Sequence, residues 1–310
     1  MNAVILGYGV VGKGIEILTN SLDDISIKYV YVRKEKENLP YFSNNEDMVV
    51  QDDIDIVFEC LNGLEPANTL IQKALKKGKH VISSNKAVVA TYLDTYLELE
   101  KEYGGSIQVE ACVAGGIPFI DALLKLKRLE PLQGYEGIFN GTSNYILDSM
   151  QKNNLDFEDV LKEAQNKGYA EKDPSNDIDG VDVYYKTKIS NSLAFNTPIV
   201  DIPYYAGIRT IKMLDIKFIK MNNKVIRHLS ISRQIDDKII SIIAPCCMDE
   251  NDFLANVPSN YNAQKILSHS FDTLGYYGQG AGQLPTAQAM VQNALDTLEN
   301  KERKIVYSTP

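Results

Sequence analysis

A glycine-rich stretch near the N-terminus constrains the fold of this chain more than any other feature of its sequence. The stretch, residues 7–12 (GYGVVG), follows a short apolar run and opens a segment with Val11, Ile15 and Leu18 on one helical face. Glycines at this spacing allow a tight turn, and they let a pyrophosphate approach the N–H groups at the start of a helix. A lone G-x-G-x-x-G is weak evidence, but between a strand and a helix it predicts a dinucleotide-binding site.

Apolar strands and helical segments alternate after this motif. Strand-like runs occupy residues 25–32, 54–61, 80–84 and 107–111, and helices are expected over 65–77 and 90–103. This alternation predicts an α/β fold with a parallel sheet of the Rossmann type. A strand at 131–139, and later runs at 207–213, 224–232 and 238–244, predict a second, α+β domain with an antiparallel or mixed sheet.

Two positive residues, Arg33 and Lys34, follow the second expected strand. An NAD site usually has an acid at this point, where it binds the ribose hydroxyls. Positive charge there suits a 2′-phosphate instead, so the sequence favours NADP over NAD. The alternative is that both side chains are simply solvated at the end of a strand.

Two further segments follow expected strands. Lys86 comes after the run at 80–84, and ligands of open α/β sheets bind at the carboxyl ends of the strands, so Lys86 is a candidate site residue. The segment 110–118 (EACVAGGIP) places a carboxylate beside a glycine-bent backbone. Glu110 and several carbonyls there could hold a hard monovalent cation, although the chemistry alone favours a loop that binds only itself.

Residues 168–186 (GYAEKDPSNDIDGVDVYYK) concentrate carboxylates ahead of a lysine. If Asp182 and Lys186 lie on one helix, their spacing places them on the same face, one turn apart. The ordinary interpretation of such a pair is a surface ion pair. The preceding loop, punctuated by glycine and proline, also allows polar side chains to converge on a ligand. A calcium loop is excluded, because its first and twelfth positions would be Ser175 and Lys186 rather than acids.

The composition argues against several classes of protein. A net charge of −9 argues against nucleic acid or an anionic membrane surface as the main partner. The chain shows neither a basic leader nor a window of 18 apolar residues, so we expect a cytoplasmic protein without a membrane span.

The cysteines lack CxxC spacing, which predicts reduced thiols: Cys60, Cys112, Cys246 and Cys247. The histidines have no catalytic setting, and we expect structural roles for all of them: His80, His228 and His269.

A collinear set of segments resembles the homoserine dehydrogenase family. The segments are GYGVVGKG (7–14), EPANTL (65–70), GKHVISSNKA (78–87), EACVAGGIP (110–118), FNGTSNYIL (139–147), GYAEKDPSNDIDGVDVYYK (168–186) and GQGAGQLPTAQA (278–289). They span most of the chain, whereas residues 208–275 match poorly. The family interconverts L-aspartate 4-semialdehyde and L-homoserine with a nicotinamide cofactor. The resemblance therefore implies an NAD(P)-dependent oxidoreductase of threonine and methionine biosynthesis.

The resemblance also implies roles for individual residues. Lys186 falls on the catalytic lysine of the family, and Lys86 falls on a second lysine between cofactor and substrate. The residues expected to bind substrate or to fix the lysine are Glu171, Asp177 and Asp182. The residues expected to bind the cofactor are Gly7, Gly9, Val10, Val11, Gly12, Arg33, Asn62, Ser84, Lys86 and Gly280. The residues that fall on a sodium-binding loop of some members are Glu110, Val113, Gly115 and Ile117.

The chemistry of the substrate agrees with these roles. Homoserine carries an α-ammonium group, which carboxylates such as Glu171 can bind by charge-assisted hydrogen bonds. A lysine beside the reacting oxygen can stabilise developing charge and relay a proton. A second lysine nearby would lower the pKa of Lys186, and Asp182 would oppose that shift.

The domain organisation follows from the same comparison. We expect a dinucleotide-binding domain over residues 1–127, to which a C-terminal helix at 284–310 returns, and a catalytic and dimerisation domain over 128–283. Family members form dimers, so a homodimer is expected. Asn62-Gly63 stands where many members have Gly-Gly, and the chain has no room for their ACT domain, which predicts a short form without threonine feedback. The alternatives are a truncated chain, a related dehydrogenase of another small amino- or oxo-acid, and a non-catalytic NADP-binding sensor.

Overall fold

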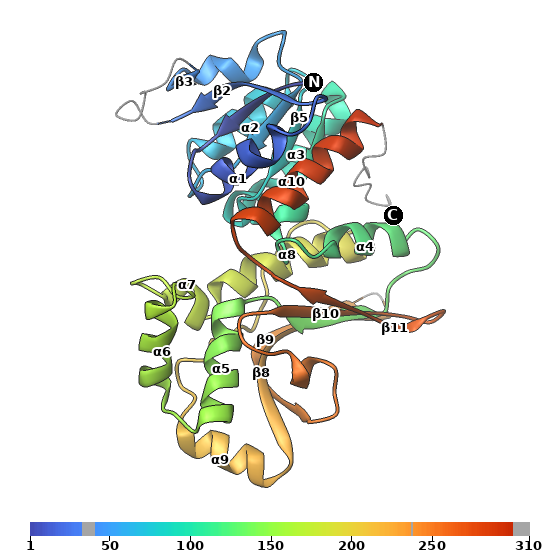
Figure 1. The fold of residues 1–310 in the computed structure, drawn as a ribbon. Coiled ribbons are helices and arrows are strands. Elements are labelled where there is room, and N and C mark those ends of the chain that lie inside the picture. The colour runs from blue at the N-terminus through green and yellow to red at the C-terminus, as the bar shows by residue number, and fades with distance from the viewer. Residues whose placement is uncertain (33–40, 237, 300–310) are drawn as a thin grey trace. The chain divides into compact units, whose positions relative to one another are not determined.

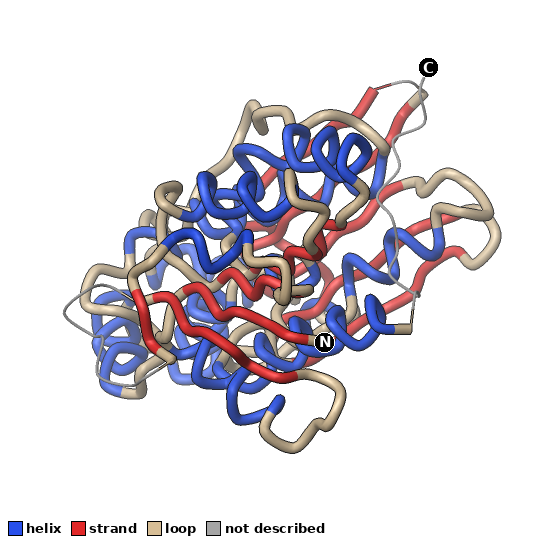
Figure 2. Tube along the Cα trace, turned by 90° about the horizontal axis from the view of Figure 1, so that it is seen from above, coloured by secondary structure: helices blue, strands red, loops and turns tan. Residues whose placement is uncertain are grey.

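The protein forms two compact units. The computed structural model describes residues 1–32, 41–236 and 238–299. Unit 1 contains Met1–Leu124 and the chain from Ala281 onward, and unit 2 contains Lys125–Gly280. Figure 1 labels many of the elements of both units and colours the chain by residue number, and Figure 2 distinguishes helices from strands by colour.

Unit 1 is built on a six-stranded sheet in which every strand pair between described residues is parallel. Its order is β3-β2-β1-β4-β5-β6, so the chain proceeds from β1 toward one edge and later from β4 toward the other. The carboxyl ends of β1 and β4 therefore flank the switch point where doubly wound sheets bind their ligands. The strands are β1 (Asn2–Leu6), β2 (Ser26–Tyr31), β3 (Phe42–Ser43), β4 (Ile56–Glu59), β5 (His80–Ser83) and β6 (Ser106–Gln108).

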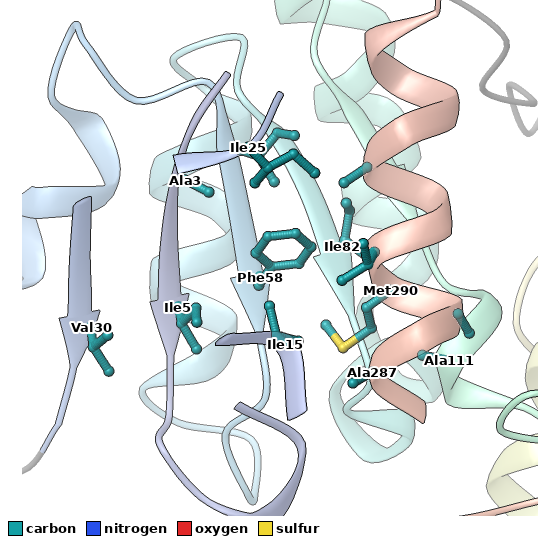
Figure 3. Close-up of a cluster of buried hydrophobic side chains, with 14 of the residues drawn as sticks. Ala3, Ile5, Ile15, Ile25, Val30, Phe58, Ile82, Ala111, Ala287 and Met290 are labelled. Atoms are coloured by element: carbon teal, nitrogen blue, oxygen red, sulfur yellow. The ribbon is translucent and has the colours of Figure 1, made fainter. Parts of the chain in front are cut away.

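Helices α1 and α10 pack against this sheet through an apolar core. Ile5, Phe58 and Ile82 extend from β1, β4 and β5 and are fully buried with Ile15 of α1 and Met290 of α10 (Figure 3). The α-helices of unit 1 are α1 (Val10–Thr19), α2 (Ala67–Leu75), α3 (Lys86–Tyr103) and α10 (Gln283–Leu298), with 3₁₀ turns η2 (Glu46–Val50) and η3 (Glu110–Cys112), and α4 (Phe119–Leu126) crosses the boundary to unit 2.

The last helix belongs to the first unit although it is far away in sequence. A Cβ built on Gly14 of α1 would lie only 2.8 Å from the Cβ of Ala287 in α10. Glycine at this position lets the two helices approach closely enough for Met290 to reach the core of the sheet.

Unit 2 contains a five-stranded antiparallel sheet of order β11-β10-β7-β8-β9. One isolated parallel bridge joins Tyr205 to Ile243 of β9. Helices α5 and α8 contact β8 and cover part of the sheet. The strands are β7 (Gly134–Ile138), β8 (Lys224–Ile235), β9 (Lys238–Asp249), β10 (Asn262–Ser268) and β11 (Asp272–Gly278), and the helices are α5 (Gly141–Asn153), α6 (Phe157–Asn166), α7 (Ser175–Ile178), α8 (Val181–Phe195), α9 (Met213–Met221) and the 3₁₀ turn η4 (Leu254–Asn256).

The prediction of a strand at residues 207–213 is wrong. Residues 207–212 form no strand, and helix α9 begins at Met213. Ile208 is buried in a helical core and donates its N–H to the carbonyl of Ile178 at 2.7 Å. Arg209 forms two hydrogen bonds to the carboxylate of Asp179. These tertiary contacts outweigh the β propensity of the isoleucines and threonine in this segment.

Among the described residues, the structure contains no helix with both the length and the apolar character that a membrane crossing requires.

Candidate active site

The glycine loop of unit 1 is packed closely at two of its glycines and open at a third, as far as the described residues show. Gly7 has φ +95°, and a Cβ on Gly12 would lie 2.1 Å from the carbonyl oxygen of Gly7, so neither position tolerates a side chain without a shift. A Cβ on Gly9, by contrast, would meet no atom of the described residues within 4 Å. The loop is therefore packed tightly on its protein side and open at Gly9, as close approach of a phosphate requires.

The start of helix α1 continues this open surface. Gly9 is its N-cap and contributes no side-chain capping hydrogen bond, and Val10 in the first turn is 64% exposed. The first N–H groups of a helix carry partial positive charge and suit an anion. This loop and helix start thus fit a bound pyrophosphate at the switch point of the sheet. They contain the cofactor-binding candidates Gly7, Gly9, Val10, Val11 and Gly12.

Ser84 and Lys86 follow the carboxyl end of β5. Because the strands are parallel, they lie at the same end of the sheet as the glycine loop. Ser84 donates its N–H to the carbonyl of Glu59 at 3.0 Å. Lys86 is the first residue of α3 and is partly buried. The helix expected from residue 90 starts earlier because Asn85 caps it, with its Oδ1 accepting from the N–H of Val88 at 3.3 Å.

Glu59 is a buried residue of this edge that the sequence patterns did not single out. It ends β4, is fully buried, and accepts hydrogen bonds from Ser83, Leu61 and Asn85. Burial raises the pKa of its carboxyl to about 7, against the lowering effect of those bonds. An acid at the end of an otherwise apolar strand (IVFE) was the available signal. Arg33, on which the NADP preference depends, lies outside the described residues.

Lys186 lies at the centre of the polar cluster in unit 2. It is 7% exposed, and its Nζ donates to Oδ2 of Asp182 at 2.8 Å and to the carbonyl of Phe139 at 2.6 Å. Asp182 is 4% exposed, so this is a buried ion pair rather than a surface one. The four-residue spacing on α8 does bring the two side chains together, as the sequence predicted.

Asn140 links this pair to a second carboxylate. Its Nδ2 donates to Oδ1 of Asp177 at 2.7 Å and to Oδ2 of Asp182 at 2.9 Å, so the two carboxylates lie close together. Its Oδ1 caps α5 by accepting from the N–H of Ser143 at 2.7 Å. Burial, and then the charge of Asp182, raises the pKa of Asp177. The sequence patterns assigned Asn140 no role, and an asparagine at the N-cap of α5 was the available signal.

The remaining substrate candidate, Glu171, is exposed at the surface of unit 2. The hydrogen bond described for it uses its main-chain carbonyl, which accepts from Nε2 of Gln165 at 3.1 Å. The described contacts do not join its carboxylate to the Lys186 cluster. Gly280 is also in unit 2, where it packs against the buried amide of Asn262.

The Glu110 loop combines a buried acid with a sharp backbone turn. Oε1 and Oε2 of Glu110 accept from the N–H groups of Ile120 and Asp121 at 3.0 and 2.6 Å, so the residue caps α4. Burial, and then the charge of Asp121, raises the pKa of Glu110 to about 8. Ala114 and Gly115 have φ +60° and +57°, which bends the chain that carries the expected carbonyl ligands. The donor set of one carboxylate and several carbonyls is of the type that hard cations prefer.

A pocket of about 350 Å³ in unit 2 is separate from these residues. Its wall includes Asp148, Lys220 and Arg227, and it contains none of the predicted site residues. Arg227 and Asp148 form a buried ion pair there. The pocket is therefore not the candidate active site.

The fold and these two groups of residues define a class of protein. A doubly wound sheet with an open glycine loop, and a buried lysine–carboxylate cluster in a second unit, are features of a nicotinamide-dependent oxidoreductase. The family model "Homoserine dehydrogenase, NAD binding domain" matches residues 7–110, and the family model "Homoserine dehydrogenase" matches residues 118–295. The chain belongs to the homoserine dehydrogenase family.

Individual relatives agree with this assignment. The chain is 33% identical to the homoserine dehydrogenase of Neisseria gonorrhoeae, over 100% of this chain and 75% of that protein. It is 36% identical to that of Synechocystis sp., over 94% of this chain and 72% of that protein. The crystal structure of a homoserine dehydrogenase from Thiobacillus denitrificans is similar with a TM-score of 0.92 and 33% identity, covering 99% of this chain and 76% of that one.

Proposed function

We propose that this enzyme interconverts L-homoserine and L-aspartate 4-semialdehyde, with Lys186 as the residue that exchanges a proton with the substrate oxygen. The observation that carries the proposal is the burial of the Lys186 amine between Asp182 and the carbonyl of Phe139. An amine held by two oxygens has a fixed position, and a fixed donor can act on one substrate oxygen.

A nicotinamide cofactor held at the glycine loop would supply the hydride acceptor for C4 of homoserine and, in reduced form, the hydride donor for the aldehyde carbon. Lys186 takes the hydroxyl proton during oxidation and gives a proton to the aldehyde oxygen during reduction. Asp182 fixes the amine through its 2.8 Å bond and balances the charge of the ammonium form. The residues of the protein therefore position the substrate and move its proton.

Asp177 and Glu171 are proposed to bind the substrate's α-ammonium group. Asp177 and Asp182 accept from the same amide nitrogen of Asn140, so their negative charges repel each other. A bound cation relieves that repulsion, and the ammonium group of homoserine supplies one. Glu171, exposed on the segment that leads to α7, is available to approach the substrate from solvent.

We propose NADP as the preferred cofactor, held by the glycine loop, Ser84, Lys86 and Arg33. The support for NADP over NAD is the Arg33 charge that follows β2 in sequence. A hyperthermophilic archaeal homoserine dehydrogenase, 23% identical to this chain, has been solved in complex with NADPH. If Arg33→Ala leaves the ratio of NADP to NAD affinity unchanged, the argument from charge is wrong.

We further propose that the Glu110 loop binds a sodium ion. The carboxylate of Glu110 is 5% exposed, and each of its oxygens retains a lone pair beyond the N–H bond it accepts. A cation there, with carbonyls of Val113, Gly115 and Ile117, would offset the cost of burying this charge. Sodium chloride should raise the thermal midpoint of the protein above its value in choline chloride, and Glu110→Gln should abolish that difference.

The two units divide these tasks in our proposal. Unit 1 is the dinucleotide-binding domain, and unit 2 is the catalytic and dimerisation domain of a homodimer, with the boundaries expected near residues 127 and 283. Sedimentation of the purified enzyme tests the dimer.

The central experiment follows nicotinamide absorbance with L-homoserine and either NADP or NAD. Lys186→Ala should lower kcat by about 10²–10⁴-fold, the usual contribution of a positioned acid–base group. Lys188→Ala is the matched control, because Lys188 is on the same helix but pairs with exposed Asp201. Equal activity of both variants would contradict the role of Lys186. No turnover by folded wild-type protein that still binds a cofactor would contradict the homoserine assignment and favour another substrate.

A further inference from the structure

Glu59 lies at the carboxyl end of a central strand of unit 1, at the end of the sheet where ligands bind. It is the last residue of β4, and in register it pairs with Leu6 of β1 and with Ser83 of β5. Leu6 directly precedes the glycine loop, so Glu59 is next to the switch point of the sheet. Its side chain is fully buried, and it cannot itself contact a ligand.

Three donors converge on the carboxylate of Glu59. Oε2 accepts from the hydroxyl of Ser83 at 2.6 Å. Oε1 accepts from the N–H of Leu61 at 2.8 Å and from Nδ2 of Asn85 at 3.4 Å. These bonds join the end of β4, the end of β5 and the turn that follows β4. A buried carboxylate with three donors is costly to replace by an apolar group, which would leave the donors unpaired.

The same donors hold the segments expected to bind the cofactor. Asn85 donates to the carbonyl of Gly63 at 2.8 Å, so the turn at residues 61–63 is held at its start by Glu59 and at its end by Asn85. Leu61 extends back toward the glycine loop, where its Cδ2 would lie 3.2 Å from a Cβ on Gly7.

Asn85 extends the network to helix α3. Its Oδ1 caps this helix at the N–H of Val88, and the first helical residue is Lys86. The single amide of Asn85 therefore connects Glu59, the 61–63 turn and the start of α3. A change at Glu59 is expected to reach both the turn and Lys86.

We infer that Glu59 is a positioning residue that orders the 61–63 turn and the Asn85–Lys86 helix start for cofactor binding. This inference rests on the proposed function, because it assumes that these two segments contact the nicotinamide cofactor. Glu59 acts through Leu61, Ser83 and Asn85. It exchanges no proton with the substrate.

The test compares Glu59→Met, which removes every acceptor, with Glu59→Gln, which keeps an amide oxygen for Leu61 and Asn85. The matched control is Glu100→Met, since Glu100 is also buried in unit 1 but accepts from the N–H of Ile107 on β6. NADPH binding is measured directly by fluorescence titration, and the KM for homoserine is measured at saturating cofactor. Near-UV circular dichroism establishes that each variant is folded.

Glu59→Met should raise the Kd for NADPH by about tenfold or more, the effect of losing hydrogen bonds to a buried charged group. Glu59→Gln should remain within about threefold of wild type, because an amide retains most of the bonds. At saturating cofactor, the KM for homoserine should rise by a smaller factor than the Kd for NADPH in Glu59→Met, whereas a general loss of structure would raise both equally.

Other outcomes overturn the inference. It is wrong if folded Glu59→Met binds NADPH as tightly as wild type, or if Glu100→Met weakens binding equally. If Glu59→Met does not fold, Ser83→Ala takes its place, because it removes one donor and buries no new group. An unchanged Kd for NADPH in folded Ser83→Ala would then overturn the inference. Failure of the wild-type protein to bind NADPH or NADH would instead contradict the proposed function.

Discussion

Asn140 connects the capping of α5 to the charge balance of the candidate active site, and its substitution should separate the two roles. In Asn140→Ala, the N-cap bond to Ser143 and both bonds to Asp177 and Asp182 are lost. Loss of a cap costs about 1 kcal/mol. Each of the two bonds to a carboxylate contributes about 1.5–3 kcal/mol, so the free energy of unfolding should fall by roughly 4–7 kcal/mol.

Asn140→Asp isolates the second role. An aspartate retains an oxygen for the N–H of Ser143, so α5 keeps its cap. It also places a third carboxylate against Asp177 and Asp182, which raises the cost of ionising all three. The cap should restore about 1 kcal/mol, but repulsion among the three carboxylates opposes this gain, so the free energy of unfolding should exceed that of Asn140→Ala by no more than about 1 kcal/mol. Its kcat/KM for homoserine should be at least as low, about 10²-fold below wild type, because the substrate cluster is disrupted.

Urea unfolding measures the free energy of unfolding, and steady-state kinetics measure kcat/KM. Both are carried out at about pH 7.5, where histidine side chains are ordinarily uncharged. Asn256→Ala is a control of the same chemistry, since its amide donates to main-chain carbonyls of Glu250 and Asp252 at the surface of unit 2. Recovery of activity in Asn140→Asp, together with its stability, would refute the argument that the amide holds two like charges together. An effect of Asn140→Ala no larger than that of the control would refute the hydrogen-bond network itself.

Two further predictions concern stability against pH and the glycine loop. His228 is fully buried, and burial lowers its pKa to about 4. This imidazole therefore binds a proton near pH 6.5 in the unfolded chain, but only near pH 4 in the folded protein. The free energy of unfolding should therefore fall by roughly 3 kcal/mol as the pH drops through this window. His228→Gln should flatten the dependence of the urea midpoint on pH, whereas His269→Gln at the surface should leave it unchanged. In the glycine loop, the methyl group of Gly9→Ala would meet no atom of the described part of the chain, so the free energy of unfolding should change by less than about 1 kcal/mol. NADPH binding should weaken by about tenfold, because the methyl group enters the space assigned to the pyrophosphate. Unchanged NADPH binding measured by fluorescence would contradict that assignment.

Local patterns in the sequence were sufficient for the features that depend on neighbouring residues. The strand, glycine turn and helix at the N-terminus follow from apolar spacing and from the freedom of glycine, and the structure confirms them. The contact between Asp182 and Lys186 is equally local, because four residues make one helical turn. The family was also recognisable from its motifs, and the comparisons confirm it.

Features that depend on residues far apart needed the tertiary structure. The strand expected at 207–213 was wrong because burial of Ile208 and pairing of Arg209 decide that segment. The joint contact of Asn140 with Asp177 and Asp182 spans about forty residues of chain, and the network of Glu59 with Asn85 joins the ends of separate strands. Sequence periodicity reports which face of an element is buried. It cannot report which polar groups meet when sheets and helices assemble, since that depends on strand order and register.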